Sequence, residues 1–342
     1  MKSSWLSRAL TPRHEFRISR AQRREVRNVF VRVERDGMAG YGEASPNAFY
    51  NETPETVEHH LAAARPWLES LRISTVADIE AAWEEGWRWL SPSRAAQCAV
   101  DLALWDWLAR SKRVSVCELL WGRAPHDIPT FCTIGLSTPD ELTGKLAELG
   151  NFPRIKLKSD KHADIGIVRR VREKSAAMLA VDANCAWGAL DLETIAGELE
   201  SLRVEFIEQP LPPGEEAAIP ARRRMPVLAD ESCVVESDID RAAPFFDGFN
   251  IKLVKCGGLT PARRMTLRGR QLDRSVMIGC MLESSLLIAA GAALAQHTHY
   301  ADLDGAWLLA DDPFTGWNFR GGILHPPADY GLGAAPAALT FF

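Results

Sequence analysis

The chain has 342 residues, of which 46% are hydrophobic and 25% are charged, as is ordinary for a globular protein. Its length allows one large barrel together with a smaller domain. The formal net charge of −5 and the pI near 6.0 argue against nucleic acid as the main partner.

The seven cysteines are scattered along the chain in mostly apolar surroundings. Their odd number and irregular spacing favour free thiols in a reducing compartment over a disulfide framework. The first residues are rich in arginine but lack the apolar centre of a secretory signal. They fit a first strand followed by a basic loop, which we favour over the alternative of a transit peptide. The longest apolar run, 286–295, is about half of the roughly 20 residues that a membrane-spanning helix needs, which favours a buried helix. We therefore expect a cytoplasmic protein without a membrane partner.

The first 50 residues are expected to form strands. Residues 29–34 alternate between apolar and polar side chains, Asp36-Gly37 is typical of a tight turn, and residues 40–44 fit a second strand. This pattern predicts a β-hairpin. An arginine-rich connection at 17–24 precedes it, and this connection fits either a solvated loop or a lid that binds a carboxylate.

Residues 54–112 are expected to be helical. Thr53-Pro54 places a capping residue directly before a helix-starting proline. Residues 93–110 carry apolar side chains at helical spacing, which predicts a packed amphipathic helix. The first ~120 residues therefore fit a domain of the α+β type, a hairpin followed by helices.

From about residue 127 the pattern changes to an alternation of strands and helices. Helices are expected at 163–174 and 192–202, among others. Eight short strands fit a closed barrel, whereas an open doubly wound sheet usually carries a glycine-rich phosphate turn, for which Gly257-Gly258 is weak evidence. The eight strands are expected at 128–135, 153–158, 178–182, 203–208, 226–230, 248–252, 275–280 and 299–303.

The chain is expected to divide into three parts. A first domain covers 1–124, and the barrel covers 125–311. The remaining segment, 312–342, is rich in proline and glycine and is expected to return over the first domain.

Five successive strands are expected to deliver a charged side chain at their C-terminal ends. Separations of 22 to 26 residues between these side chains match one strand, one helix and two loops per step. A barrel of repeated β/α units would bring all five ends to one face. These side chains are Lys158, Asp182, Glu208, Asp230 and Lys252.

The three acids of this series predict a metal site. Three carboxylates in a small volume repel one another unless a cation is present. An all-oxygen set without Cys or His suits Mg²⁺, with Mn²⁺ as a possible substitute. The alternative is three separate ion pairs or helix caps. Convergence of Asp182, Glu208 and Asp230 at three successive strand ends favours the metal.

Two lysines flank the acids in sequence, and both are candidate acid/base groups. Lys156 and Lys158 lie on the same side of one strand, so they are expected to lower each other's pKa, as a general base requires. Lys252 ends the strand on the opposite side of the barrel. One base on each side of a substrate carbon would invert its stereocentre. Surface lysines on an edge strand are the alternative.

Metal and lysines fit one reaction. Removal of a proton next to a carboxylate creates an enediolate with a second negative charge. A divalent metal bound to that carboxylate stabilises the new charge. The residues therefore predict proton transfer next to a substrate carboxylate.

Six motifs together resemble the muconate-lactonizing subgroup of the enolase superfamily. The resemblance covers nearly the whole chain in order. The motifs are Lys156-Leu157-Lys158, Asp182-Ala183-Asn184, Glu208-Gln209-Pro210, Ala229-Asp230-Glu231-Ser232, Asn250-Ile251-Lys252 and the helix at 99–106.

The resemblance implies a (β/α)7β TIM-like barrel under an N-terminal α+β capping domain that the C-terminal tail completes. It also implies roles for the motif residues. Asp182, Glu208 and Asp230 would be Mg²⁺ ligands, Lys158 and Lys252 the two acid/base lysines, and Lys156, Asn184 and Glu231 supporting residues. Mandelate-racemase-type relatives use a His after strand seven, where this chain has Ile278-Gly279-Cys280. His297 and His299 are expected to enter strand eight from the other face.

Two further acids, Asp302 and Asp304, follow strand eight and point to one side. Two more carboxylates beside an acid-rich metal site are expected only if they bind a cation of their own. The resemblance suggests which cation, because dipeptide epimerases of the L-Ala-D/L-Glu type hold the substrate's ammonium group with such an Asp-x-Asp pair. A helix cap by Asp304 is the alternative.

Further substrate contacts are expected from the capping loop and the barrel mouth. A glutamate side chain of the substrate would meet the arginines of the loop through charge-assisted hydrogen bonds. These candidates are Arg20, Arg23 and Arg24 in the loop, and Thr133, Cys280 and Met281 at the barrel mouth.

The resulting hypothesis is a Mg²⁺-dependent isomerase that epimerises a dipeptide, L-Ala-D/L-Glu from murein peptides, by two-base proton transfer. The alternatives are o-succinylbenzoate synthase, N-succinylamino acid racemase, an epimerase of another dipeptide, and a non-catalytic relative that binds a metal or a partner. Two opposed lysines argue against the last. Homo-oligomers are common in the subgroup, but the sequence fixes no number of subunits.

Overall fold

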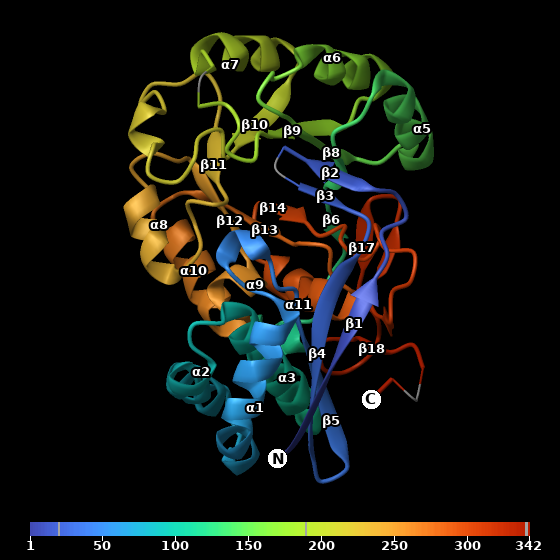
Figure 1. Ribbon diagram of the computed structural model, residues 1–342, viewed down its shortest axis with the longest axis vertical. Coiled ribbons are helices and arrows are strands. Elements are labelled where there is room, and N and C mark those ends of the chain that lie inside the picture. Colours follow the sequence, from blue (N-terminus) through green and yellow to red (C-terminus); the bar gives the residue numbers. More distant parts are fainter. Residues whose placement is uncertain (20, 189, 339–340) are drawn as a thin grey trace.

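The computed structural model describes residues 1–19, 21–188, 190–338 and 341–342. Figure 1 shows a barrel above a smaller N-terminal domain, with the C-terminal tail beside both. Arg20, one of the expected substrate contacts, lies outside the described residues. Within the described ranges, no helix is both long enough and apolar enough to cross a membrane.

An antiparallel sheet in the order β1-β4-β5 forms the first layer of the N-terminal domain. The predicted hairpin is confirmed, and its two turn residues, Asp36 and Gly37, both have positive φ, as a two-residue hairpin turn requires. Gly42 lets helix α3 approach the sheet, because a Cβ there would lie 1.9 Å from the Ala99 carbonyl oxygen. The strands are β1 Lys2–Leu10, β4 Val26–Arg35 and β5 Met38–Ala44.

Helices cover one face of this sheet, as expected from residues 54–112. The Thr53 side chain caps the first of them by accepting from the Thr56 amide, and the Ser93 side chain caps α3 in the same way. The helices are α1 Pro54–Ser70, α2 Val76–Leu90, α3 Arg94–Lys112 and α4 Val116–Trp121, with a short 3-10 turn, η1 Ala48–Tyr50, before them.

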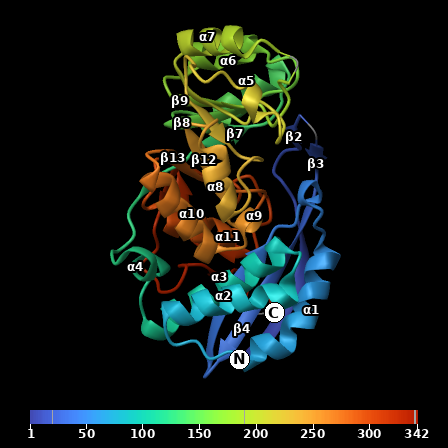
Figure 2. The same ribbon diagram turned by 90° about the vertical axis from the view of Figure 1, so that its left-hand side faces the viewer.

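The basic connection contains a small hairpin that the sequence did not predict. Strands β2 (Phe16–Ile18) and β3 (Ala21–Arg23) are too short to show a clear period. Contacts with the barrel hold the hairpin, since the Leu136 amide donates to the Arg17 carbonyl over 2.9 Å. Figures 1 and 2 show that this hairpin extends from the N-terminal domain to the barrel mouth.

Eight parallel strands form the barrel, in the order in which they occur along the chain. The Phe131 amide donates to the Ala301 carbonyl over 2.8 Å and nearly closes the ring between the first and last strands. The strands are β7 Cys132–Ile134, β8 Arg154–Lys158, β9 Met178–Asp182, β10 Val204–Glu208, β11 Val227–Ala229, β12 Gly248–Lys252, β13 Ser275–Gly279 and β14 Tyr300–Asp302.

The expected strand at 128–135 is wrong in one respect, because it is divided in two. Its first part, β6 (Ile128–Pro129), leaves the barrel and pairs with β17 of the tail. Pro129 has no amide hydrogen to donate to a barrel neighbour. Only the second part, β7, belongs to the barrel sheet.

Helices connect the barrel strands, and the apolar run at 286–295 is the buried helix that was expected. Between β10 and β11 the described chain forms only the 3-10 turn η2 (Glu216–Ala218). The helices are α5 Pro139–Leu149, α6 Ile165–Lys174, α7 Leu192–Ser201, α8 Glu236–Ala242, α9 Leu253–Cys256, α10 Leu259–Gln271 and α11 Ser285–Ala295.

The C-terminal tail returns to the N-terminal domain. Phe314 stacks on Phe30 with ring centroids 5.5 Å apart, and the Leu332 amide donates to Asp106 of α3 over 2.7 Å. The boundaries at residues 124 and 311 stay a prediction. The tail strands are β15 Phe314–Thr315, β16 Asn318–Arg320, β17 Ile323–His325 and β18 Ala335–Pro336.

Side chains fill the lower part of the barrel interior and leave its C-terminal end for chemistry. A buried cluster closes the centre, and the Tyr300 hydroxyl donates to Glu205 over 2.8 Å. Polar side chains therefore gather at the opposite end, as in other parallel barrels. The cluster consists of Phe131, Ala180, Phe206, Leu228 and Met277.

Candidate active site

A cavity of about 620 Å³ lies between the C-terminal ends of the barrel strands and the loops of the N-terminal domain. Its volume is that of a typical small-molecule site. The barrel lines it with Thr133, Lys156, Lys158, Asn184, Lys252, Cys280, Met281, Asp302 and Asp304. The N-terminal domain contributes, among others, Phe16, Ile18, Arg23, Asn47, Phe49 and Tyr50.

The three predicted metal ligands lie together beside this cavity. Asp182 and Glu208 end β9 and β10 and occupy matching register positions, while Asp230 follows β11 directly. One carboxylate oxygen from each acid lies within 4.8 Å of the other two, and all three side chains are buried. An all-oxygen donor set of this size fits a hard divalent cation such as Mg²⁺.

The two predicted acid/base lysines lie on opposite sides of the triad. Lys158 ends β8 and donates to Asp182, and Lys252 ends β12 and donates to Asp230 Oδ2 over 2.8 Å. Three strands separate β8 from β12 in either direction around the barrel. Both lysines also line the cavity, so a substrate bound there would lie between them.

Lys156 is fully buried among carboxylates. It donates to Glu208 Oε2 over 3.0 Å and to Asp302, and it lies 3.6 Å from Asp182. The expected lowering of its pKa by Lys158 is therefore wrong. Burial acts to lower the pKa of Lys156, but the surrounding acids, Asp302 first, raise it well above its ordinary value.

Glu208 differs from the other two acids of the triad, because its pKa is raised whereas those of Asp182 and Asp230 are lowered. Burial, and then the neighbouring Asp182, raise the pKa of Glu208 to about 7, although Lys156 acts to lower it. The other oxygen of Glu208, Oε1, accepts a hydrogen bond from Asn250 Nδ2 over 2.7 Å. Lysines thus compensate the triad only in part, and a bound cation fits this balance.

Asp302 and Asp304 are both buried at the barrel mouth, but they have different partners. Asp302 is held by Lys156, and Thr133 Oγ1 donates to it over 3.4 Å. Asp304 Oδ2 accepts from the Thr133 amide over 2.6 Å and so binds a strand instead of capping a helix. Burial, followed by the charge of Asp302, raises the pKa of Asp304 to about 7.

The arginines in and directly after hairpin β2/β3, which we call the capping hairpin, have different surroundings. Arg23 is half-buried and lines the cavity, and its guanidinium group has no hydrogen-bond partner in the part of the chain that the structure describes. Arg24 is exposed and pairs with Glu15, away from the cavity lining. Arg17, which was not singled out, pairs with Glu141 of α5 and helps to hold the hairpin.

The remaining predicted residues surround the triad and the mouth. Asn184 donates through its amide to Asp182 Oδ1 over 2.8 Å and through Nδ2 to Oδ2 over 3.2 Å. Glu231 is buried, and its charge is one of those near Lys252. Met281 accepts from Asn47 Nδ2 at 3.8 Å, so it links the barrel mouth to the N-terminal domain.

Sequence analysis missed two polar residues that support the triad. Gln209 accepts through Oε1 from the amides of Asp230 and Ser232, over 2.8 and 3.1 Å. Lys255 is completely buried and donates to Asp230 Oδ1 over 2.7 Å. Gln209 belongs to a quoted motif, and Lys255 lies three residues after Lys252, but neither spacing revealed these contacts.

Two family profiles match consecutive parts of the chain. Residues 4–121 match the N-terminal domain of mandelate racemase / muconate lactonizing enzyme. Residues 140–338 match the enolase C-terminal domain-like family. The two matched regions correspond to the domain with the capping hairpin and to the barrel with most of the tail.

Known proteins are similar over almost their full lengths. The L-Ala-D/L-amino acid epimerase of Flavobacterium johnsoniae is 36% identical over 316 residues, which cover 91% of this chain and 93% of the relative. The L-Ala-D/L-Glu epimerase of Escherichia coli K12 is 34% identical over 316 residues, 91% and 95% of the two chains. A dipeptide epimerase structure from Methylococcus capsulatus, with Mg and L-Arg-D-Lys, has a TM-score of 0.89 at 32% identity and covers 98% and 99%.

Proposed function

The chain belongs to the mandelate racemase / muconate lactonizing enzyme family of enolase-like proteins, and we propose that it is a magnesium-dependent dipeptide epimerase acting on L-Ala-D/L-Glu. One observation carries the proposal. Lys158 and Lys252 face a single carboxylate triad from opposite sides of the barrel. A binding protein needs no such pair, whereas an epimerase needs one base for each face of the α-carbon.

The lysines perform the proton transfer. With the α-carbon of the C-terminal residue between them, one lysine removes the proton and the other returns a proton to the opposite face. A Mg²⁺ ion held by Asp182, Glu208 and Asp230 would supply positive charge to the substrate carboxylate as the proton leaves. We propose Mn²⁺ as a substitute, because it accepts similar oxygen ligands.

The N-terminal ammonium group of the substrate would bind at Asp302 and Asp304. Because Asp302 is already held by Lys156, we assign the larger share of this contact to Asp304. The raised pKa of Asp304 reflects a buried carboxyl without enough positive charge around it, and an ammonium group would supply that charge. An N-succinylated substrate has no such group, which favours the dipeptide over the racemase alternative.

The side chain of the epimerised residue would point toward the N-terminal domain. Arg23 is half-buried in the cavity wall and is therefore our candidate partner for a substrate glutamate. Relatives at similar identity are named with different dipeptides: the E. coli enzyme is an L-Ala-D/L-Glu epimerase, whereas the Methylococcus structure holds L-Arg-D-Lys. An epimerase of another dipeptide is thus the second candidate.

We further propose that the substrate comes from murein peptides and that the enzyme works in the cytoplasm as a homo-oligomer. Each of the seven cysteines is a free thiol, which supports a reducing compartment.

Deuterium exchange tests the proposed function. The protein is incubated in D₂O with Mg²⁺ and a panel of dipeptides and N-succinylamino acids, and α-deuterium is followed by mass spectrometry. We expect exchange and epimer formation with L-Ala-L-Glu and L-Ala-D-Glu, loss of both with EDTA, and recovery with Mg²⁺. Turnover of an N-succinylamino acid with no exchange in any dipeptide would overturn the proposal.

A further inference from the structure

Lys255 has a contact set unlike that of the other lysines at the site. Its ammonium group lies 2.6 Å from the main-chain oxygen of Asp230, 2.7 Å from Asp230 Oδ1 and 2.8 Å from the Cys233 carbonyl oxygen. A fourth oxygen, the Asn250 carbonyl, lies at 3.2 Å. Since an ammonium group has three protons to donate, these contacts use its full capacity.

This geometry excludes Lys255 from proton transfer with the substrate. The side chain has no exposed surface, and it does not contribute to the lining of the cavity. Lys252, by contrast, lines the cavity and holds the other oxygen of the same carboxylate, Asp230 Oδ2. Asp230 Oδ1 is therefore held by a lysine outside the cavity lining, and Oδ2 by a lysine that lines the cavity.

Two lysines hold Asp230 at once. Lys252 donates to Oδ2 and Lys255 to Oδ1, so each carboxylate oxygen has its own ammonium partner. The contacts of Lys255 with the Cys233 and Asn250 carbonyls also tie the loop after β11 to β12.

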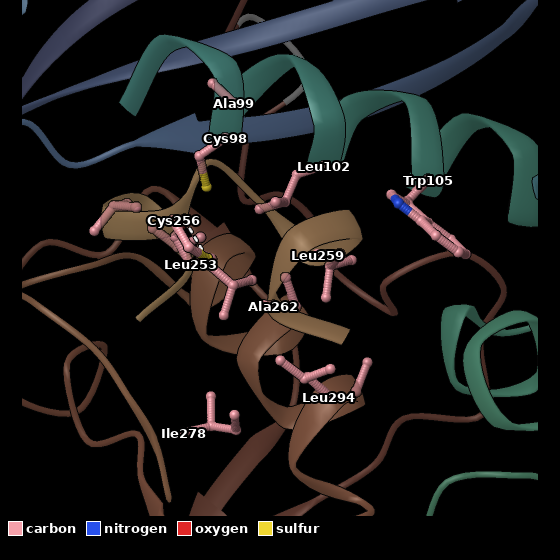
Figure 3. Close-up of a cluster of buried hydrophobic side chains, with 14 of the residues drawn as sticks. Cys98, Ala99, Leu102, Trp105, Leu253, Cys256, Leu259, Ala262, Ile278 and Leu294 are labelled. Atoms are coloured by element: carbon pink, nitrogen blue, oxygen red, sulfur yellow. Dashed lines mark hydrogen bonds between the residues drawn. The ribbon is translucent and has the colours of Figure 1, made fainter. Parts of the chain in front are cut away.

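The short helix α9 holds Lys255 in this position, and the N-terminal domain holds α9. Figure 3 shows Leu253 and Cys256 of α9 beneath Cys98 and Leu102 of α3, within one buried cluster. Helix α9 ends at Cys256, and the carbonyl of its C-cap residue, Gly257, accepts from Trp83 Nε1 over 2.8 Å. The ammonium group is thus placed by a rigid support that reaches across the two domains.

The next glycine explains the close approach of the two domains. Gly258 has a φ of 125°, and a Cβ there would lie 2.4 Å from Asp101 Oδ2 of α3. A larger residue at this position would push α9 away from α3. The glycine pair therefore fixes the position of the helix that carries Lys255.

We propose that Lys255 is a positioning residue for the metal site, which holds Asp230 in the orientation that a divalent cation requires. The proposal rests on the magnesium-dependent function proposed above. Nothing in the contacts of Lys255 reaches the substrate cavity, so its effect must act through Asp230. Partners of this kind, behind a metal ligand, typically change metal affinity by ~10–100-fold when they are removed.

Calorimetry of Mg²⁺ binding without substrate tests this inference. Lys255→Met keeps an unbranched side chain that is one atom shorter and removes the charge, and we expect the dissociation constant for Mg²⁺ to rise by ~10–100-fold. Lys145→Met is the matched control, because Lys145 is half-buried on α5 and donates to Ser137 over 2.9 Å, far in sequence from the triad. Its Mg²⁺ affinity should equal that of the wild type.

A second readout separates positioning from a merely structural role. Epimerisation by Lys255→Met should recover when Mg²⁺ is raised in proportion to the lost affinity, whereas Lys252→Ala should keep its low rate at every Mg²⁺ concentration. Thermal unfolding in EDTA checks that both variants are folded. A Lys255→Met protein with lowered Tm but unchanged Mg²⁺ affinity would overturn the proposal.

Lys255→Met leaves the buried carboxylate of Asp230 with one partner fewer, and this cost could prevent folding. A double variant covers that case. Asp230→Asn removes that charge, so Asp230→Asn/Lys255→Met is compared with Asp230→Asn alone. Equal Mg²⁺ affinities are expected if Lys255 acts through Asp230, and weaker binding by the double variant contradicts this route. A wild-type protein that binds no Mg²⁺ would instead overturn the proposed function itself.

Discussion

The two walls of the cavity differ in how firmly their side chains are held. On the barrel wall, the buried Lys156 donates to the buried carboxylates of Glu208 and Asp302, which come from two other strands. On the capping wall, Phe49 is 43% exposed, and the side chain of Arg23 has no hydrogen-bond partner among the described residues. Rigid elements position reacting groups more accurately than loops do. The barrel wall is therefore suited to the chemistry, and the capping wall to the choice of substrate.

The largest expected effect concerns the barrel wall. Lys158→Ala and Lys252→Ala should each lower the rate of epimerisation by ~10²–10⁴-fold, because each removes the acid/base group on one face of the α-carbon. Both rates are measured by chiral chromatography from either epimer, with Lys145→Met as a control that keeps wild-type activity. Full two-way turnover by either alanine variant would show that the two-base assignment is wrong.

The next effect concerns the junction of the two walls, where Asp304 is expected to hold the substrate's ammonium group. Asp304→Asn should lower kcat/KM for a dipeptide by ~10- to 100-fold, since a hydrogen bond to a charged group contributes about 1.5–3 kcal/mol. The comparison substrate is the same dipeptide with an acetylated N-terminus, for which wild type and variant should be equally poor. A larger loss for the acetylated substrate would contradict this role.

A smaller effect is expected on the capping wall. Arg23→Ala should raise KM for L-Ala-L-Glu by about 10-fold, because a charge-assisted hydrogen bond to the glutamate side chain is lost. The KM for L-Ala-L-Ala should change little. Arg24→Ala is the matched control, because Arg24 pairs with Glu15 outside the cavity lining and should leave both substrates unaffected. If Arg23→Ala affected the two dipeptides equally, the cavity wall would not select an acidic side chain through Arg23.

The smallest expected effect is a change in thermal stability, and it concerns two buried carboxyls at the contact between the two domains. Glu43 accepts from the Ser284 amide over 3.1 Å, and Asp101 accepts from the Thr260 amide over 3.0 Å, so each carboxyl of the N-terminal domain joins a barrel helix. Burial raises the pKa of each to about 7. An acid whose pKa is higher in the folded state stabilises that state below its unfolded pKa and loses this contribution as pH rises toward 7.

Glu43→Gln and Asp101→Asn should therefore flatten the decline of Tm between pH ~4 and ~7 that these two carboxyls cause. The slope of Tm against pH is the relevant measure, because the amides also lose hydrogen bonds and lower Tm at every pH. Asp78→Asn is a suitable control, since Asp78 is a capping residue at the surface whose pKa is lowered, not raised, by the amides of Ser74 and Thr75. Slopes identical to that of the wild type would contradict the assignment.

The sequence revealed the barrel wall better than the capping wall for a physical reason. Asp182, Glu208 and Lys252 end apolar runs that repeat at one β/α period, so their convergence follows from the topology alone. Hairpin β2/β3 has strands of three residues each and is held by contacts such as Arg17 with Glu141, which no local pattern records. It is this hairpin that places Arg23 in the cavity lining and Arg24 beside Glu15, outside it.

Lys255 and Lys156 show a second limit of the sequence. Spacing places Lys156 beside Lys158. It does not show that Asp302 and Glu208, from strands far along the chain, accept hydrogen bonds from Lys156 and reverse the expected change of its pKa. Likewise, the contacts of Lys255 depend on the one-turn helix α9 and on its packing against α3. Contacts of this kind join residues that are distant in sequence, so the spacing of residues along the chain does not predict them.

The stereochemical course of the reaction in D₂O tests the central claim, two opposed lysines across one metal site, most directly. Epimerisation of L-Ala-L-Glu is stopped after a small fraction of turnover, and the α-deuterium of product and remaining substrate is measured separately. Two bases predict a product that carries solvent deuterium and a remaining substrate that still carries its original proton. A product that retains the substrate's own α-proton would mean that one base serves both faces, and would contradict the roles assigned to Lys158 and Lys252.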